Sequence, residues 1–490
     1  MIRNSRQYPQ PARAPLRRPG AVTSRQGHSL TDSRANARLA HYETGVKGTF
    51  DAIIPVLKQL SARQHEPNFE TVAQQLVQQQ LGFALPEELL AAAWVTQLDM
   101  RKLYAMATFS TYRQFADRFY SDNPLGAMSD AEFEPWLQSC GFHTLDISPC
   151  ADGRLAHLIR YVLRLPHRAV RRKSYAGSLF DIEDSLQKWV EVEMLRYREG
   201  RPNLADEPTR YLKVVAYHFS SVDPEHEGCA AHGSDTEKAA KAGLERLLAF
   251  QQAIENSFCC GASIDLLLLG LDTDTDAIRI HLPDGKGELA LNRYVDTLQL
   301  YQQSYSDHPQ QAEQTIESAI GYASPDIDPG MARFIQAIAI NNLSQIDYVK
   351  QHHGSHYHDI GHAERFIGAG VGFEEIQLRN LMYFAYLNTV EEATQDLDVG
   401  IKIFTGLNVS RSLPIPIVIR FDYHSRVPGA RERAVEKCQR VAAAINSRYA
   451  ELATQGLLHT LQVIRDCNTH DAPLETLHCS VKASLKVGAH

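Results

Sequence analysis

The sequence has no long hydrophobic run. Its longest apolar stretch is LLLLGL at 266–271, far short of the roughly 18 to 20 residues that span a bilayer. It also begins without the apolar core of a secretory signal, which favours the reducing cytoplasm over export. We therefore expect a cytoplasmic protein that makes no membrane contact.

Cysteine is sparse, and neither sign of charge dominates. The 490 residues contain eight cysteines, and the formal net charge is -8. The cysteines are scattered, unlike those of a small disulfide-stabilised domain, so free thiols are available as metal ligands. The net charge argues against a protein whose whole surface binds nucleic acid. The remaining composition is that of folded soluble proteins, and the length predicts two or three domains.

The first 39 residues differ in composition from the rest. They carry eight arginines and a single acid, Asp32, together with many prolines and serines and few large aliphatic side chains. This composition predicts a disordered basic arm over 1–39 that docks on an acidic partner. An organelle transit peptide is the alternative, although the prolines oppose an amphipathic helix.

Two kinds of pattern divide the remaining chain. Residues 40–121 have apolar side chains at helical spacing and predict an all-α domain, with a helix cap expected at Asn68. Beyond about residue 140, strand and helix patterns alternate. The predicted fold class is α/β, in which the helical domain is followed by a first α/β domain over 122–374 and a second over 375–490.

Each α/β domain contains a predicted strand–helix–strand unit. The units occupy 211–219, 236–258 and 262–272 in the first domain, and 414–423, 430–452 and 457–466 in the second. Aligning them sets Val214 against Val418, a shift of 204, and Asp272 against Asp466, a shift of 194. The ten extra residues of the first copy fall in its strand-to-helix loop, which contains Cys229. We interpret the units as a duplication, and similarity of architecture alone is the alternative.

Soft metal ligands occur near strand ends in the first copy. His218 ends one predicted strand, Cys229 lies in the loop after it, and Cys150 follows TLDISP (144–149), a third candidate strand. Functional groups of open α/β sheets gather at the carboxyl ends of strands, so these side chains are expected to converge. Two thiolates and one imidazole make a zinc site with an open fourth position, as in catalytic zinc sites. A buried apolar cysteine and a solvated histidine are the simpler alternatives.

Asp152 and Arg154 follow Cys150 at alternate positions. If the backbone is extended, the thiol, carboxylate and guanidinium share one face. Arg154 would then hold the Asp152 charge away from the metal through a charge-assisted pair, and a surface ion pair is the alternative. In the second copy Asp422 takes the place of His218, so that copy is expected to have lost the metal site.

The pattern C-x-D-x-R of CADGR (150–154), with a later histidine and cysteine, resembles the β-class carbonic anhydrases. The stretch VVAYHFSSVDPEHEGCAAHGSD (214–235), the helical region and the degenerate second copy resemble the carboxysome shell carbonic anhydrases, a divergent group of that class found in α-carboxysomes. The resemblance covers about residues 40–490. Ordinary β-class members have two residues between the histidine and the second cysteine, whereas ten separate His218 from Cys229 here, and the carboxysomal group shares this longer loop.

This resemblance implies one Zn²⁺ per chain on Cys150, His218 and Cys229, with Asp152 and Arg154 as the catalytic gating dyad. It implies reversible hydration of CO2 to bicarbonate and a proton, in which the ion makes a water acidic enough to give hydroxide and Asp152 accepts that hydroxide's hydrogen bond. It also implies a location inside the carboxysome, where the enzyme supplies CO2 to Rubisco. A homodimer or higher oligomer, and docking of the arm on Rubisco or shell proteins, are further expectations of the same kind.

Two other functions remain open. A scaffold protein with a structural zinc, whose basic arm binds an acidic partner, would have four protein ligands and no open position. Another zinc hydrolase would turn over esters or amides.

The segment HHGSHYHDIGH gathers five histidines between His352 and His362. Their spacing is irregular, so a second metal site, a proton relay and a polar loop are all consistent with it. The motifs of zinc proteases, EF-hands and zinc deaminases are each incomplete in this sequence.

Overall fold

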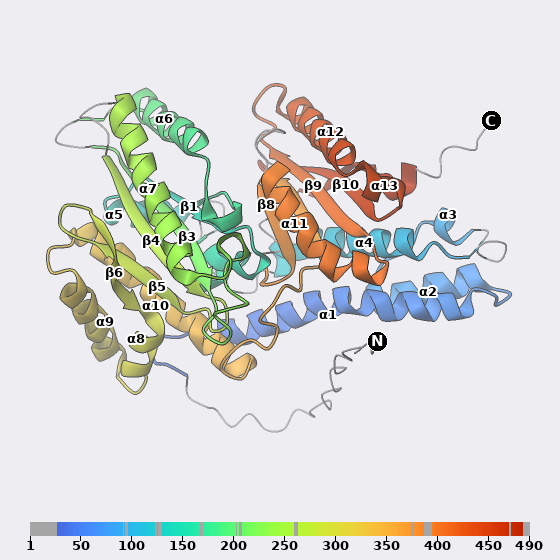
Figure 1. The fold of residues 1–490 in the computed structure, drawn as a ribbon, viewed down its shortest axis with the longest axis horizontal. Helices are drawn as coiled ribbons and strands as arrows, with labels where there is room; N and C mark the ends of the chain where they lie inside the picture. The colour runs from blue at the N-terminus through green and yellow to red at the C-terminus, as the bar shows by residue number, and fades with distance from the viewer. Residues whose placement is uncertain are drawn as a thin grey trace, which may run out of the picture.

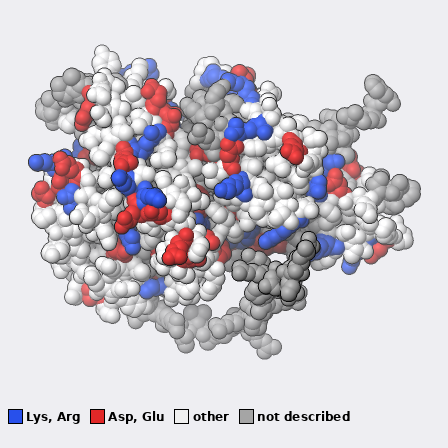
Figure 2. All heavy atoms as spheres, in the orientation of Figure 1, with Lys and Arg blue, Asp and Glu red and all other residues white. Residues whose placement is uncertain are grey.

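A helical region and two α/β halves make up the computed structural model (Figure 1). The structure describes residues 27–91, 93, 97–122, 125, 130–166, 170–201, 203–204, 208–258, 263–373, 377–386, 394–469 and 472–483. Lysine and arginine alternate with aspartate and glutamate over the described part of the face in Figure 2, so neither sign of charge dominates that face. Among the described helices, none combines the length and hydropathy that a bilayer crossing requires.

The helical region contains α1 (Ser33–Arg63), α2 (Phe69–Leu81), α3 (Glu87–Leu90) and α4 (Met100–Asp122). Helix α1 begins inside the predicted arm 1–39, because the Asp32 carboxylate accepts hydrogen bonds from the backbone N–H groups of Arg34 and Ala35 at 3.0 and 2.9 Å. Asp32, the only acid of residues 1–39, is therefore the cap of a helix that the composition of that segment did not predict. Residues 1–26 of the arm lie outside the described residues. Helix α2 follows Asn68 as predicted, although the Asn68 side chain makes no cap hydrogen bond.

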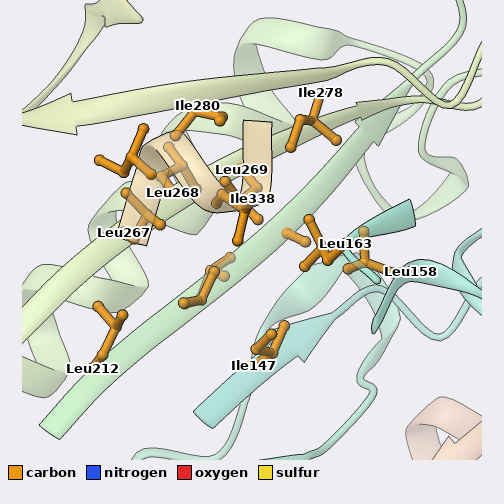
Figure 3. Close-up of a cluster of buried hydrophobic side chains, with 14 of the residues drawn as sticks. Ile147, Leu158, Leu163, Leu212, Leu267, Leu268, Leu269, Ile278, Ile280 and Ile338 are labelled. Carbon is orange, nitrogen blue, oxygen red and sulfur yellow. The ribbon is translucent and has the colours of Figure 1, made fainter. Parts of the chain in front are cut away.

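The first half is built on a six-stranded sheet with the order β2-β1-β3-β4-β5-β6. Its elements in chain order are α5 (Asp130–Ser139), β1 (Thr144–Pro149), β2 (Arg171–Arg172), α6 (Ile182–Arg198), β3 (Arg210–Phe219), α7 (Thr236–Phe258), β4 (Ser263–Asp272), β5 (Ile278–Pro283), β6 (Leu289–Asp296), α8 (Thr297–Gln303), α9 (Pro309–Ala323) and α10 (Pro329–His352). Strands β1, β3 and β4 run parallel, as their apolar sequences predict. Figure 3 shows part of their core, where Leu269 of β4 lies beside Ile338 of α10.

The second half has a five-stranded sheet with the order β11-β10-β9-β7-β8. Its elements are β7 (Phe366–Val371), β8 (Met382–Tyr386), α11 (Thr394–Leu407), β9 (Ile415–Tyr423), α12 (Ala430–Arg448), α13 (Ala450–Thr454), β10 (Leu458–Asp466), β11 (Glu475–Cys479) and α14 (Ser480–Ala483). Both faces of this sheet are covered: Val418 joins the core shared with the helical region, whereas Ile417 and Ile419 join the core shared with α12. Burial on both faces explains why β9 reads as a continuous apolar run.

The second half starts earlier than the sequence indicates. Strand β7 begins at Phe366, before the predicted boundary between 374 and 375, and pairs in parallel with β8 and β9. Its sequence, FIGAGV, contains two glycines and therefore gives a weak strand signal.

The two sheets repeat one plan. Taken across the sheet from one edge, strands β2-β1-β3-β4-β5 of the first half correspond to β8-β7-β9-β10-β11 of the second. In each set the last strand is antiparallel to its neighbour, and the others are parallel. Val214 pairs with Leu267 in the first sheet, and Val418 pairs with Leu461 in the second. These pairings reproduce the shifts of 204 and 194 residues, so the register agrees with the alignment of the two units. The fold class predicted from the sequence is confirmed.

Candidate metal centre and active site

Three ligand side chains from the first half meet at one end of its sheet. Cys150 follows β1, His218 lies in β3, and Cys229 lies in the loop before α7. Strands β1 and β3 are parallel neighbours, with Pro149 opposite Ala216, so Cys150 follows at the level of Tyr217, next to His218. One ligand atom from each of the three residues lies within 4.8 Å of the other two. This spacing suits a single ion with bonds of about 2.0 to 2.3 Å.

The His218 imidazole has the environment of a metal ligand. The side chain is fully buried, and neither ring nitrogen has a hydrogen-bond partner among the described residues. A buried polar group without a partner costs roughly 1–3 kcal/mol, so an imidazole in this position needs another kind of partner. A metal ion bound to one ring nitrogen would provide it.

The two thiols are buried together, with 5% of Cys150 and 3% of Cys229 exposed. The hydrogen bond to Cys229, together with burial, raises the pKa of Cys150 well above its usual range. The same hydrogen bond, made by the Cys150 thiol, lowers the pKa of Cys229 despite its burial. Sulfurs held this close favour a cation that both thiolates can bind.

Asp152 and Arg154 form a buried, bidentate ion pair beside these ligands. Arg154 Nε donates to Asp152 Oδ1 at 3.0 Å and Nη2 donates to Oδ2 at 2.8 Å. Asp152 Oδ2 lies 3.6 Å from His218 Nε2. Burial opposes ionisation of Asp152, but the charge of Arg154, followed by those of His362 and His218, holds the pKa of this carboxyl well below its usual range.

An extended backbone would have placed Cys150, Asp152 and Arg154 on one face, but the backbone here is not extended. The strand ends at Pro149, and Gly153–Leu155 form a short 3-10 helix that Asp152 caps by accepting a hydrogen bond from the Arg154 N–H at 2.9 Å. The turn brings Arg154 back onto the carboxylate. The carbonyl oxygens of Glu227 and Ile360 then accept from Arg154 Nη1 at 2.6 and 3.0 Å and fix the guanidinium.

His362 is the only member of the histidine segment that reaches this site in the described structure. Its Nε2 lies 3.9 Å from Asp152 Oδ2, and its Nδ1 lies 3.0 Å from Glu364 Oε1. Burial would lower the pKa of His362, but Asp152 and then Glu364 raise it to about 9. The sequence drew attention to the segment, but its irregular spacing did not distinguish His362 from its neighbours. Glu364 was missed altogether, since nothing local connects it to Asp152.

The other histidines of the segment lie against neighbours outside the site. The rings of His352 and His353 contact Tyr348, and those of His356 and His358 contact each other. Asp152, His362 and Glu364 also place three ligand atoms within 4.8 Å of one another. Both oxygens of Asp152 already bind Arg154, so this trio is better explained as charged neighbours of that pair, with one hydrogen bond between His362 and Glu364, than as a second metal site.

Part of the site's wall comes from the second half. Tyr383 of β8 and the apolar side chains of Val399 and Ile403 of α11 line the same small cavity as the ligands and Asp152. The cavity therefore lies between the halves, with polar groups on one side and largely apolar groups on the other.

The second half lacks all three ligands at the matching positions. Pro149 lies opposite Ala216 in the first sheet, and Gly370 lies opposite Arg420 in the second. Val371 therefore takes the place of Cys150, and Asp422 takes that of His218. No cysteine occurs in the loop between β9 and α12, so the repeat carries no counterpart of the ligand cluster.

The fold and the site together define an α/β protein whose described residues bring two cysteines and one histidine together, a donor set that suits zinc. Three family models match the chain: the N-terminal part of carboxysome shell carbonic anhydrase at residues 28–120, its catalytic domain at 132–362 and its C-terminal part at 363–481. The chain belongs to the carboxysome shell carbonic anhydrase family. The boundary between the last two models coincides with the start of the second half at β7.

Named relatives extend over most of the chain. It is 56% identical to the carboxysome shell carbonic anhydrase of Parasynechococcus marenigrum, over 95% of this chain and 81% of that protein. It is 54% identical to the protein of that name from Prochlorococcus marinus strain MIT 9313, over 94% of this chain and 90% of the relative. The identity to the Halothiobacillus neapolitanus protein is 49%, over 88% and 86% of the two chains.

Proposed function

We propose that this chain hydrates CO2 reversibly to bicarbonate and a proton at one zinc ion held by Cys150, His218 and Cys229. In the carboxysome this carbonic anhydrase would supply CO2 to Rubisco. The observation that supports the proposal most strongly is the convergence of three buried ligand atoms within 4.8 Å. Two sulfurs and one imidazole are the donor set of catalytic Cys₂His zinc sites.

A zinc ion held there would supply a water acidic enough to serve as the nucleophile toward CO2 near neutral pH. Asp152 is ionised, because Arg154 keeps the pKa of this carboxyl low. It can therefore accept a hydrogen bond from the nucleophile and orient it, while the bidentate pair with Arg154 keeps its charge off the ligand position. The apolar wall of Val399 and Ile403 suits a small uncharged substrate.

A scaffold protein with a structural zinc is the alternative from another class. Such a site requires a fourth protein ligand. Among the described residues Asp152 is the candidate beside the ligands, and both of its oxygens are engaged by Arg154. The geometry therefore favours an open position over a saturated one.

Zinc removal and replacement tests the function. We expect stopped-flow CO2 hydration by the wild-type protein to be lost after chelation and restored by one equivalent of Zn²⁺ per chain. A wild-type protein that holds stoichiometric zinc and does not hydrate CO2 would support the scaffold.

The partners proposed from the resemblance are a second copy of the chain and, for the arm, Rubisco or shell proteins. Helix α1 starts at Ser33, so removal of residues 1–26 leaves every described helix intact. We expect that deletion to leave turnover unchanged and to prevent packaging into carboxysomes. Normal packaging of the shortened protein would contradict the role of the arm.

A further inference from the structure

The turn that carries the catalytic pair is held from the second half of the molecule. Phe384 N donates to the Ala151 carbonyl at 3.3 Å, and Asn380 N donates to the Gly153 carbonyl at 2.9 Å. Gly153 N in turn donates to Glu364 Oε1 at 3.2 Å. Both backbone polar groups of Gly153, the residue between Asp152 and Arg154, are therefore bound by residues of the C-terminal family region at 363–481.

Glu364 is an unusual residue for a contact between two halves. The residue is 3% exposed, and its Oε1 is shared between Gly153 N and His362 Nδ1. Oε2 is buried and has no hydrogen-bond partner among the described residues. Burying a carboxylate in this way is costly unless it is paired. A contact that only joined the halves would not need an acidic side chain here.

Gly153 is shaped to admit this carboxylate. Its backbone does not have the positive φ that favours glycine. A Cβ atom at this position would instead lie 2.5 Å from Glu364 Cγ and 2.7 Å from Oε1, far inside normal contact distance. Glycine is thus required by the close approach of Glu364 and not by the conformation of the turn.

We propose that Glu364 is a positioning residue for the reaction. It fixes the peptide between Asp152 and Arg154 through Gly153 N–H, and the same oxygen orients the His362 imidazole, whose Nε2 points to Asp152. The half without a metal site thereby completes the site of the other half. This role rests on the proposed function, because it assumes that Asp152 orients the nucleophile.

The test compares Glu364→Ala, Glu364→Gln and a matched control, Asp396→Ala. Asp396 is another buried acid of the second half that accepts a backbone N–H of the first, from Ala176 at 2.7 Å, but it does not touch the catalytic pair. We expect Glu364→Ala to lower kcat about 10- to 100-fold, since small misplacements cost rate, with KM and zinc per chain unchanged. Glu364→Gln retains an acceptor for Gly153 N and should restore kcat to within about threefold of wild type. Asp396→Ala should match wild type in kcat.

A second pair of variants tests the contact itself. Gly153→Ala should lower kcat as much as Glu364→Ala, and adding it to Glu364→Ala should cost little more, because the side chain it meets has gone. A crystal structure of Glu364→Ala should show the 152–154 turn displaced.

Three outcomes overturn the role of Glu364. They are wild-type kcat in a zinc-loaded Glu364→Ala, equal losses in Glu364→Ala and Asp396→Ala, and fully additive losses in the Gly153→Ala/Glu364→Ala double variant. An inactive, zinc-loaded wild type would instead overturn the proposed function, and this role with it.

Discussion

The two α/β halves share one strand order, yet among their described residues only the first half brings two cysteines and a histidine together. In the first half, His218 lies beside two cysteines and has no hydrogen-bond partner among the described residues. In the second, Asp422 has the matching position and forms a bidentate pair with Arg420 at 2.7 and 2.8 Å. The carboxylate there is neutralised by a cation from its own strand. The comparison teaches that a few strand-end residues decide whether this architecture needs an external cation.

The cores of the two halves also differ in charge at one matched pair of positions. Asp146 and Lys213 pair across β1 and β3 and form a fully buried salt bridge of 2.9 Å. The matching pair across β7 and β9 is Ile367 and Ile417. The same fold therefore tolerates an ion pair or two aliphatic side chains at one place.

Loss of a metal ligand should produce the largest difference between the halves. We expect Cys229→Ser to lose zinc and to lower CO2 hydration at least about 10³-fold, because the acidic water is lost with the ion. The control is Cys438→Ser, which changes a buried thiol of the second half and should leave zinc content and turnover unchanged. Zinc bound stoichiometrically by Cys229→Ser would contradict the ligand assignment.

The two aspartate–arginine pairs offer the next comparison. Asp152→Asn should lower kcat about 10²- to 10³-fold, as loss of one catalytic hydrogen bond does. Asp422→Asn makes the same change in the second half and should keep kcat within about twofold of wild type, at some cost in stability. Stopped-flow measurements of CO2 hydration compare the two variants. Equal kcat values for both would contradict the catalytic role of Asp152.

The buried salt bridge predicts a stability difference. Lys213→Ile or Asp146→Ile alone leaves one charge buried without its partner, and we expect each to lower the free energy of unfolding by roughly 3–5 kcal/mol. The double variant copies the second half and should lose much less, apart from the cost of leaving three hydroxyls without these partners: Tyr211, which donates to Asp146, and Ser148 and Ser185, which accept from Lys213. If urea unfolding showed that the two single losses in the free energy of unfolding add up in the double variant, the two charges would not stabilise the protein through each other.

A matched pair of histidines predicts the smallest effect. His281 lies opposite Leu268 in the first sheet, and His478 lies opposite Gln462 at the equivalent place in the second. Burial lowers the pKa of His281 from its ordinary 6.5 to about 4, whereas the His478 side chain is exposed. The unfolded chain therefore binds the proton first as the pH falls below about 6.5. His281 should account for about 2 kcal/mol of stability lost between pH 7 and pH 5.

His281→Gln should flatten that part of the pH dependence, and His478→Gln should leave it unchanged. Unfolding free energies at the two pH values distinguish the variants. An unchanged slope in His281→Gln would show that this histidine is already protonated in the folded protein or is not buried there.

Elements with strong local signals were predictable from the sequence. The apolar runs of β3, β4, β9 and β10, the amphipathic helices α7 and α12, and the strand-end positions of His218 and Cys150 follow from periodicity and from the edge rule for parallel strands. These features depend on residues close in sequence or on neighbouring parallel strands.

What the sequence missed depends on contacts between distant segments. Glu364 is more than 200 residues from Gly153, so no local pattern connects them. Strand β7 contains two glycines and owes its place to burial between β8 and β9. The 3-10 turn after Pro149 replaced an expected extended backbone, because the cap by Asp152 and the carbonyls around Arg154 favour the turn.

The most direct test is zinc stoichiometry combined with X-ray absorption spectroscopy of the metal-loaded protein. We predict one zinc per chain, with two sulfurs, one imidazole nitrogen and one light-atom ligand that bicarbonate can replace. A second zinc per chain, or a shell filled by four protein ligands that bicarbonate leaves unchanged, would contradict a single open site in the first half.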